Sequence, residues 1–360
     1  MDGKALGARI AEARKALDLT QEHLANRVGI DRTALGLIEN GKRKVSAVEL
    51  VDLAAALDVP LAWFVRDPLP SVASRRAEAG PSHELTARLD RELELFSGDV
   101  ASLVAAGVIA TVADRPTWTL PRTHDDSEKV AQQVREHLGA GTEPLLDMAG
   151  IAERFGLYSC SLALGAGGAD GALVEVADGA AAAVIDGDAQ PGRRRMSLAH
   201  ELGHWLFGDA YDAGADNAER MINSFAIHFL APRAGVRQLW NQCRTEPERD
   251  RAIRVAATYR VSWSAAVLHL RNLSVITDEQ YRGLEQHIPV AGEFAKLRMI
   301  RGPEELRPPT VSPGMVAAVL DAYTDRRLTA ARTLELLRGQ LQLEDLPPQR
   351  AETAADYASL

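Results

Sequence analysis

The chain has 360 residues, a formal net charge of −9, 46% hydrophobic residues and two cysteines. These values are ordinary for a globular protein of two or three domains, and they exclude a disulfide-rich scaffold and a uniformly basic surface. The N-terminus lacks the apolar core of a signal peptide, and the apolar run at 100–113 is too short to span a bilayer. We therefore expect a cytoplasmic protein with no membrane partner.

Residues 1–66 show the pattern of a five-helix domain. Apolar side chains at helix spacing predict the first helix from about Lys4 to Leu17. Helix two, a tight turn at Gly29-Ile30 and helix three form a helix-turn-helix arrangement. The capping, stop and start residues that divide the five helices are Thr20, Gly29, Asp31, Asn40, Gly41, Ser46, Glu49 and Pro60.

This segment resembles the XRE family of λ-repressor-like domains. The resemblance lies in Leu19–Ala25, Val28–Ile30 and Ile38–Arg43. It implies that the third helix enters the major groove of a double-stranded DNA operator and that the protein forms a homodimer. The residues expected to contact bases or phosphates are Gln21, Arg32, Thr33, Gly36, Lys42, Arg43 and Lys44. A helical bundle that binds only proteins is the alternative.

Residues 67–125 are interpreted as a linker or helical connection, or as the first layer of the next domain. From about residue 126 to 245 the pattern predicts an α+β domain. Two helices, the first capped by Ser127, precede strands near 158–164, 171–176 and 180–185, which we expect to form a small antiparallel sheet. The overall fold class is therefore mainly α, with an N-terminal helix-turn-helix domain and a helical C-terminal region.

The most informative motif is His200-Glu201-Leu202-Gly203-His204, on a helix expected to begin near Ser197. Two histidines four residues apart lie on one helix face, so both imidazoles can bind one Zn²⁺. Glu201 lies between them and can act as general base toward a water molecule. Gly203 suits a close approach of a neighbouring element.

The residues alone leave the third zinc ligand open. The downstream candidates are Asp209, Asp212, Asp216, Glu219 and His228. Glu219 and His228 lie on opposite sides of one helix, so both cannot face the metal. Asp216 and Glu219 also match a capping box, and His228 is more typical of a packed or solvent-edge histidine.

A second resemblance narrows this choice. The segments Arg195–His204, Glu219–Ala226 and Leu230–Pro232 resemble the ImmA/IrrE family of metallopeptidases, over about residues 126–235. The resemblance implies that Glu219 is the third ligand and that the substrate is a helix-turn-helix repressor or an antitoxin-like protein. This chain itself is a further possible substrate. Ile222 and Ala231 depart from the family pattern without touching the ligands.

Three further features each allow two interpretations. The run Arg193-Arg194-Arg195 is favoured as a solvated surface over an anion contact. Cys160 is expected to be simply buried, and an inhibitory fourth zinc ligand is the alternative. The strand near 180–185 is a hypothetical site for adding an extended peptide to the sheet.

Residues 246–345 are predicted to be helical, with a helix-turn-helix-like pair near 252–270, and 346–360 is expected to be a tail. Together these observations predict a transcription regulator with zinc endopeptidase activity. Two alternatives remain open. One is a DNA-binding factor whose peptidase-like domain is a non-catalytic sensor, and the other is a peptidase that uses its first domain only to dock on its substrate.

Overall fold

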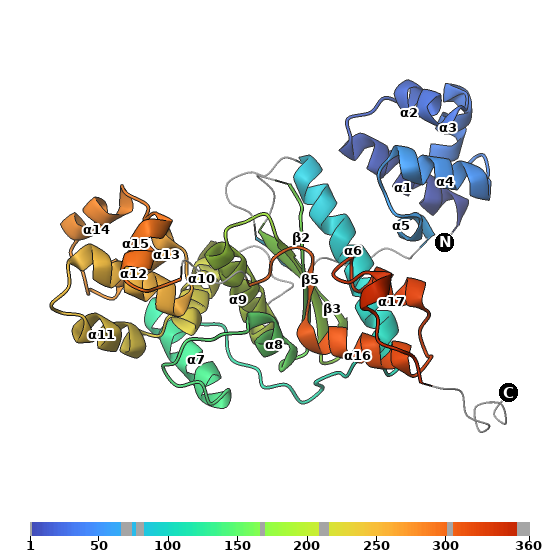
Figure 1. Cartoon of the computed structure of the whole chain (residues 1–360). Helices are drawn as coiled ribbons and strands as arrows, with labels where there is room; N and C mark the ends of the chain where they lie inside the picture. The colour runs from blue at the N-terminus through green and yellow to red at the C-terminus, as the bar shows by residue number, and fades with distance from the viewer. Residues whose placement is uncertain are drawn as a thin grey trace.

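A computed structural model describes residues 2–65, 74–76, 83–165, 170–208, 216–300 and 305–350. The N-terminal domain contains five helices at one end of the molecule (Figure 1). Their bounds are α1 Gly3–Ala16, α2 Gln21–Val28, α3 Arg32–Glu39, α4 Ala47–Ala56 and α5 Leu61–Val65.

The predicted capping residues set the limits of these helices. Thr20 accepts a hydrogen bond from the His23 amide, Gly29 ends α2 with a φ of +67°, and Ser46 forms a capping box with Glu49. Asp31 occupies the N-cap of α3, but its side chain makes no capping bond. These local signals confirm the helix limits predicted from the sequence to within about a residue.

The long helix α6, His83–Ala105, joins the N-terminal domain to the rest of the chain (Figure 1). Leu95 of α6 is part of the N-terminal core, beside Ile10 and Trp63. Arg9 is buried there and bonds both the Trp63 carbonyl and the Glu94 carboxylate of α6. The two domains therefore share packed apolar side chains and a largely buried ion pair.

A mixed five-stranded sheet forms the centre of the second domain, in the order β1-β3-β4-β2-β5. The expectation of a purely antiparallel sheet was wrong, because β2 pairs with β4 in parallel. The chain leaves β2, passes over to the far side of β4 to form β3, and returns through the Ala177-Asp178-Gly179 turn into β4. The strands are β1 Ser74–Arg76, β2 Leu157–Leu162, β3 Gly171–Ala177, β4 Ala180–Asp186 and β5 Thr310–Val311.

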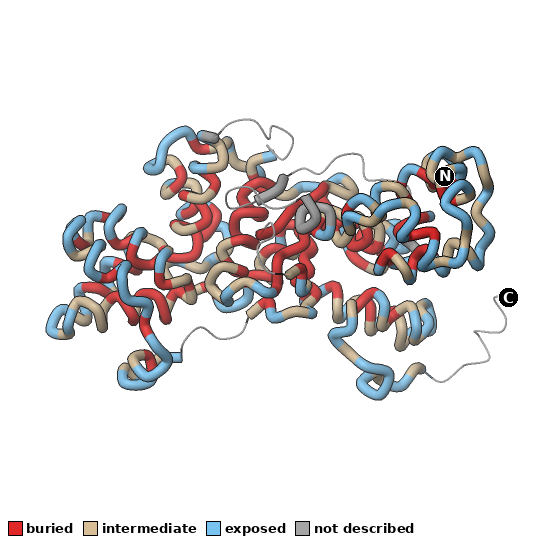
Figure 2. Tube along the Cα trace, turned by 90° about the horizontal axis from the view of Figure 1, so that it is seen from above, coloured by how far each residue is buried: buried red, intermediate tan, exposed pale blue. Residues whose placement is uncertain are grey.

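Helices cover both faces of this sheet, which is why every residue of the central strand β4 is buried (Figure 2). One apolar core lies between the sheet and α6, α16 and α17. A second, larger core lies between the opposite face and the helices that carry the histidine motif. These elements are α7 His124–His137, α8 Met148–Glu153, α9 Pro191–Phe207, α10 Asp216–Leu230, α16 Pro313–Thr324 and α17 Ala330–Leu336.

Two helices begin earlier than expected. Thr123, not Ser127, caps α7, and the Thr123 hydroxyl accepts from the Asp126 amide. Helix α9 begins at Pro191 rather than near Ser197, since proline is well suited to the first helical position.

The C-terminal third divides into two parts on opposite sides of the sheet (Figure 1). One part packs beside α9 and α10 and contains α11 Arg233–Gln242, α12 Glu248–Tyr259, α13 Trp263–Asn272, α14 Asp278–Glu285 and α15 Ala291–Lys296. The other part is α16 and α17, followed by a short turn at Leu343–Asp345.

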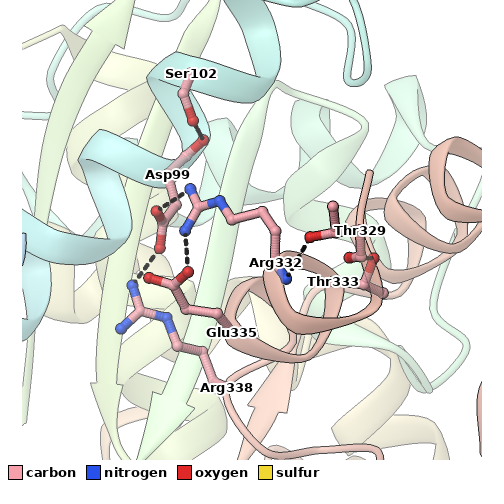
Figure 3. A network of polar contacts seen from close by, with 7 residues as sticks. All are labelled: Asp99, Ser102, Thr329, Arg332, Thr333, Glu335 and Arg338. Atoms are coloured by element: carbon pink, nitrogen blue, oxygen red, sulfur yellow. Dashed lines mark hydrogen bonds and ion pairs between the residues drawn. The ribbon is translucent and has the colours of Figure 1, made fainter. Parts of the chain in front are cut away.

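A buried ion network attaches α17 to α6 (Figure 3). The carboxylate of Asp99 is 3% exposed and pairs with Arg332 at 2.8 Å and Arg338 at 2.7 Å. Glu335 also pairs with Arg332 at 2.8 Å. Loss of either arginine would leave buried charge without full compensation, so the network fixes the C-terminal helices on this face.

Within the described residues, no helix combines the length and apolar character that crossing a membrane requires.

Candidate metal centre

Helix α9 presents His200 and His204 on one face, as their four-residue spacing requires. Both imidazoles are almost fully buried, with side-chain exposures of 0% and 6%. Their Nε2 atoms lie 3.0 Å apart. The two nitrogens are therefore directed at a common point.

Glu219, in the first part of α10, completes this arrangement. Its Oε2 lies 3.2 Å from Nε2 of His200, and its Oε1 lies 3.3 Å from Nε2 of His204. Burial on its own raises the pKa of Glu219, but the contacts with the two imidazoles lower that pKa well below its usual range. The carboxylate is thus held in the charged form that a metal ligand needs.

The donor set fits a zinc ion. Tetrahedral ligands about 2.0–2.1 Å from one Zn²⁺ lie roughly 3.3–3.4 Å from one another. The observed separations of 3.0, 3.2 and 3.3 Å are close to the edges of such a tetrahedron. The Glu219 side chain is 43% exposed, so the site opens to solvent on that side and leaves room for a fourth ligand.

Asn223 supports the site from α10, one turn after Glu219. Its Oδ1 lies 3.2 Å from Nδ1 of His200. If Nδ1 donates that hydrogen bond, Nε2 is left with its lone pair toward the metal position. Asn223 was not among the residues expected in the site, although its four-residue spacing from Glu219 places both side chains on one helix face.

Gly203 allows α9 and α10 to approach closely, as expected. A methyl group at this position would lie 3.0 Å from Ile222 and 3.1 Å from Phe225, both on α10. Any larger residue would push α10 away from α9. The separation of the three ligands therefore depends on a glycine between two of them.

Glu201 is fully buried and is directed toward the end of β3. A methyl group built on Gly171 would lie 3.4 Å from Oε1 of Glu201, so the carboxylate lies beside the backbone of that strand. Glu201 is not part of the group formed by His200, His204 and Glu219.

Two arginines in the first turns of α9, which were expected to be solvated, instead hold this end of the helix inside the fold. That interpretation was wrong for Arg194 and Arg195, because both are buried. Arg195 pairs with Glu305 and donates to the Leu145 carbonyl at 2.7 Å, and Arg194 donates to the Gly187 carbonyl. The early start of α9 places these side chains inside the fold.

None of the other ligand candidates is seen to join this group in the part of the chain that the structure describes. Asp209 and Asp212 lie outside the described residues, as does the side chain of Asp216. His228 is buried on another face of α10, where its ring packs 4.8 Å from that of His269. Among the described residues, His200, His204 and Glu219 form the single group with metal-ligand spacing.

A cavity of about 540 Å³ lies next to the metal centre, between α10 and α13. Asn223 lines it, so the cavity begins directly behind the His200 imidazole. Burial lowers the pKa of His228 to about 4 and that of His269 to about 3. Near neutral pH these two imidazoles are therefore uncharged. Met196, Ile227 and Leu268 add apolar surface, and Asp125, Arg220 and Arg233 add charged groups to the lining.

Two alternatives for this site are excluded by the sheet. Cys160 lies in the core on the face opposite α9, and burial raises the pKa of its thiol to about 12, so it does not approach the metal centre. The strand β4 is paired on both sides, with β3 and β2, so it offers no free edge to a peptide.

The residues expected to contact DNA lie together around α3, and most are exposed. Arg32, Thr33, Lys42 and Lys44 are exposed, and Gly36 lies beside the Gln21 amide. Gln21 donates to Glu39 at 2.7 Å, and Arg43 pairs with Glu49 at 2.6 Å. Lys42 and Lys44 therefore provide the more accessible positive charge of the basic cluster.

Comparison with known proteins identifies two segments. Residues 10–64 match the family described as Helix-turn-helix, and residues 152–271 match the family described as IrrE N-terminal-like domain. The second segment contains the whole His-His-Glu group and Glu201.

The individual relatives resemble the first segment. An uncharacterized transcriptional regulator in the ATPase CF(0) region of Rhodospirillum rubrum is 40% identical over 62 residues, which are 17% of this chain and 57% of that protein. Control protein C.MunI from a Mycoplasma species is also 40% identical over 62 residues, or 84% of its length. The crystal structure of the restriction-modification controller protein C.AhdI from Aeromonas hydrophila is 42% identical and covers 16% of this chain and 89% of that one, with a TM-score of 0.16.

Proposed function

We propose that this chain, which joins an XRE-type helix-turn-helix domain to an IrrE-like peptidase-family domain, is a DNA-binding regulator with zinc-dependent endopeptidase activity. The observation that carries the proposal is the convergence of His200, His204 and Glu219 at tetrahedral spacing, with Glu201 buried beside them. A zinc ion bound there would polarise a peptide carbonyl and lower the pKa of a water molecule.

The chain's own residues have separable roles in this proposal. Glu201 accepts a proton from the attacking water and returns it to the leaving amine, so one carboxylate acts first as base and then as acid. Asn223 fixes the ring orientation of His200 and thereby its ligand atom. The exposed flank at Glu219 is the side from which a peptide enters.

The cavity beside Asn223 suits a substrate side chain. Its volume of about 540 Å³ is sufficient for any natural side chain. Its wall combines apolar side chains and neutral imidazoles with Asp125, Arg220 and Arg233. We assign it to a substrate side chain next to the bond that is cut.

The DNA-binding part of the proposal rests on the N-terminal domain. Arg32 and Thr33 are exposed in the first turn of α3, the part of a recognition helix that reads base edges. Lys42 and Lys44 follow α3 and are placed for phosphate contacts. The proposed ligand is a double-stranded operator bound by a homodimer, and the proposed substrate is a helix-turn-helix repressor or antitoxin-like protein.

The test compares protein N-termini in cells that express the wild-type chain or Glu201→Gln at equal levels. We expect new N-termini with the wild type and none with the variant, because general acid–base catalysis contributes about 10²–10⁴-fold in rate. Equal zinc content in the two purified proteins is the control for metal binding. Identical sets of N-termini would overturn the peptidase and leave a DNA-binding factor with a non-catalytic sensor domain.

A further inference from the structure

Asn223 has a second polar group besides the oxygen that contacts His200. Its Oδ1 lies 3.2 Å from Nδ1 of His200, and its Nδ2 carries two further donors. Among the described residues, no group accepts a hydrogen bond from Nδ2, and this nitrogen is not one of the buried atoms that lack a partner. Asn223 is partly buried and lines the cavity between α10 and α13. The amide nitrogen is therefore accessible from that cavity.

A single stripe of α10 connects the metal centre with the cavity. Glu219, Asn223 and Ile227 follow one another at four-residue intervals, so their side chains lie on one helix face. Glu219 contacts both imidazoles of the metal centre, and Ile227 is part of the apolar wall of the cavity. Leu268 lines the cavity from α13. The stripe thus leads from a proposed metal ligand, past an amide, to an apolar wall within about two helical turns.

The amide lies within reach of a peptide whose reacting carbonyl is at the metal centre. The imidazole ring of His200 and one contact of 3.2 Å separate the metal position from Oδ1 of Asn223. Each residue of an extended peptide spans about 3.3–3.6 Å. A peptide that continues from the metal centre into the cavity therefore passes Asn223 within its first one or two residues.

An amide at this position can do more than a carboxylate. A carboxylate is a common partner for a metal-binding histidine, because it fixes the ring and raises its basicity. Asparagine keeps one acceptor oxygen for that role and also presents two N–H donors, whereas a carboxylate presents none. Every residue of a peptide carries a backbone carbonyl oxygen, which is an acceptor that such donors fit.

We propose that Asn223 is a substrate-binding residue, whose Nδ2 donates a hydrogen bond to the backbone carbonyl of the residue that places its side chain in the cavity. This inference rests on the proposed peptidase function and adds a contact that holds the peptide backbone. The hydrogen bond is independent of the substrate sequence, whereas the wall of the cavity selects the side chain. The same amide therefore orients a metal ligand and holds the substrate.

The experiment measures the binding of small hydroxamates to the zinc-loaded full-length protein by calorimetry. Each compound carries a hydroxamate for the metal, then the side chain of alanine, leucine, phenylalanine or glutamine, and then an ethyl ketone. The ketone stands for the backbone carbonyl, and a matched compound has a methylene group in its place. Acetohydroxamate is the probe for the metal alone.

Two aspartate variants are compared with the wild type. Asn223→Asp removes the donors and keeps an acceptor oxygen for Nδ1 of His200, so its zinc affinity in a chelator competition assay should equal or exceed that of the wild type. Asn272→Asp is the matched control, because it adds the same charge to the lining of the same cavity from the end of α13.

In the wild type, the ketone with the best-fitting side chain should bind at least about fivefold more tightly than its methylene partner, because the methylene compound leaves the amide without an acceptor. Asn223→Asp should abolish or reverse this difference, since a carboxylate repels the ketone oxygen. Asn272→Asp should retain it. Acetohydroxamate should bind the three proteins about equally, which separates an effect on the substrate from an effect on the metal.

Two results would overturn the inference. If the ketone gains the same factor in the wild type and in Asn223→Asp, Asn223 only orients His200. If none of the four ketones binds more tightly than its methylene partner in the wild type, no carbonyl is held in this position. Both results leave the peptidase intact, because its own test is the appearance of new N-termini in cells. If the zinc-loaded chain produces no such N-termini, the proposed function fails and the inference fails with it.

Discussion

The helix-turn-helix domain and the metal-site domain place their proposed functional residues in opposite environments. Arg32, Lys42 and Lys44 are exposed side chains in or just after α3, a helix of eight residues. His200 and Glu201 are fully buried on a helix whose position depends on α10 and on the sheet. The first site can change without disturbing the fold, whereas the second is inseparable from its packing.

The largest effect that sharpens this contrast should come from Asn223→Ala. Loss of the contact with Nδ1 of His200 frees the imidazole to rotate, and partners of this kind typically contribute 10–100-fold to metal affinity. We expect zinc affinity to fall by about that factor in a chelator competition assay. Asn241, an exposed asparagine on α11, supplies the matched control, and its alanine variant should bind zinc like the wild type.

A pair of glycine substitutions tests the packing of the buried site. Gly203→Ala places a methyl group 3.0 Å from Ile222 and 3.1 Å from Phe225, so it should destabilise the fold by about 1–3 kcal/mol and weaken zinc binding. Gly283→Ala on α14 meets no atom within 4 Å and should be neutral or slightly stabilising. Chemical denaturation with and without zinc measures both, and equal stabilities would contradict the close contact of α9 with α10.

The exposed site should respond to charge without any loss of stability. Lys42→Ala combined with Lys44→Ala should weaken operator binding by at least roughly tenfold and lower the salt slope by about 4 for the homodimer, since each lysine neutralises about one phosphate and each protomer loses two lysines. The control is Lys129→Ala combined with Lys296→Ala, which removes the same charge from side chains 73% and 72% exposed in the other domain. Equal affinities for the two double variants would remove this cluster from the DNA interface.

The smallest expected effect concerns pH. Burial, with smaller contributions from Arg233 and His124, lowers the pKa of His228 to about 4. The unfolded chain, with an ordinary histidine pKa near 6.5, therefore takes up a proton that the folded chain does not, and stability falls as pH falls. Between pH 7 and 5.5 the wild type should lose about 1 kcal/mol more than His228→Gln in denaturant titrations. His23→Gln, which removes an exposed histidine, is the matched control for the loss of an imidazole.

The extent to which the sequence predicts the structure also differs between the helix-turn-helix domain and the metal-site domain. The helices of the first domain were predicted almost to the residue because Thr20, Gly29 and Ser46 act on their own neighbours. The pair His200 and His204 was equally clear, because helical spacing alone puts both on one face. Glu219 required a resemblance, since no local signal separated it from the other acidic candidates.

The features that the sequence did not predict all depend on tertiary pairing. The parallel pairing of β2 with β4 is decided by where the chain passes over the sheet, which leaves no local mark. The burial of Arg195 follows from its pairing with Glu305, a partner 110 residues away. The position of Gly171 beside Glu201 likewise joins residues from a strand and a helix. Such contacts arise from the assembled core rather than from periodicity.

The most direct test of the buried metal centre is the zinc content of the purified protein measured by mass spectrometry, for the wild type, Glu201→Gln and Glu219→Ala. We expect one zinc per chain in the first two and loss of most of the metal in the third, because we assign Glu219, but not Glu201, as a ligand. Full zinc content in Glu219→Ala, or none in the folded wild type supplied with zinc, would contradict the assignment of His200, His204 and Glu219 as a metal site.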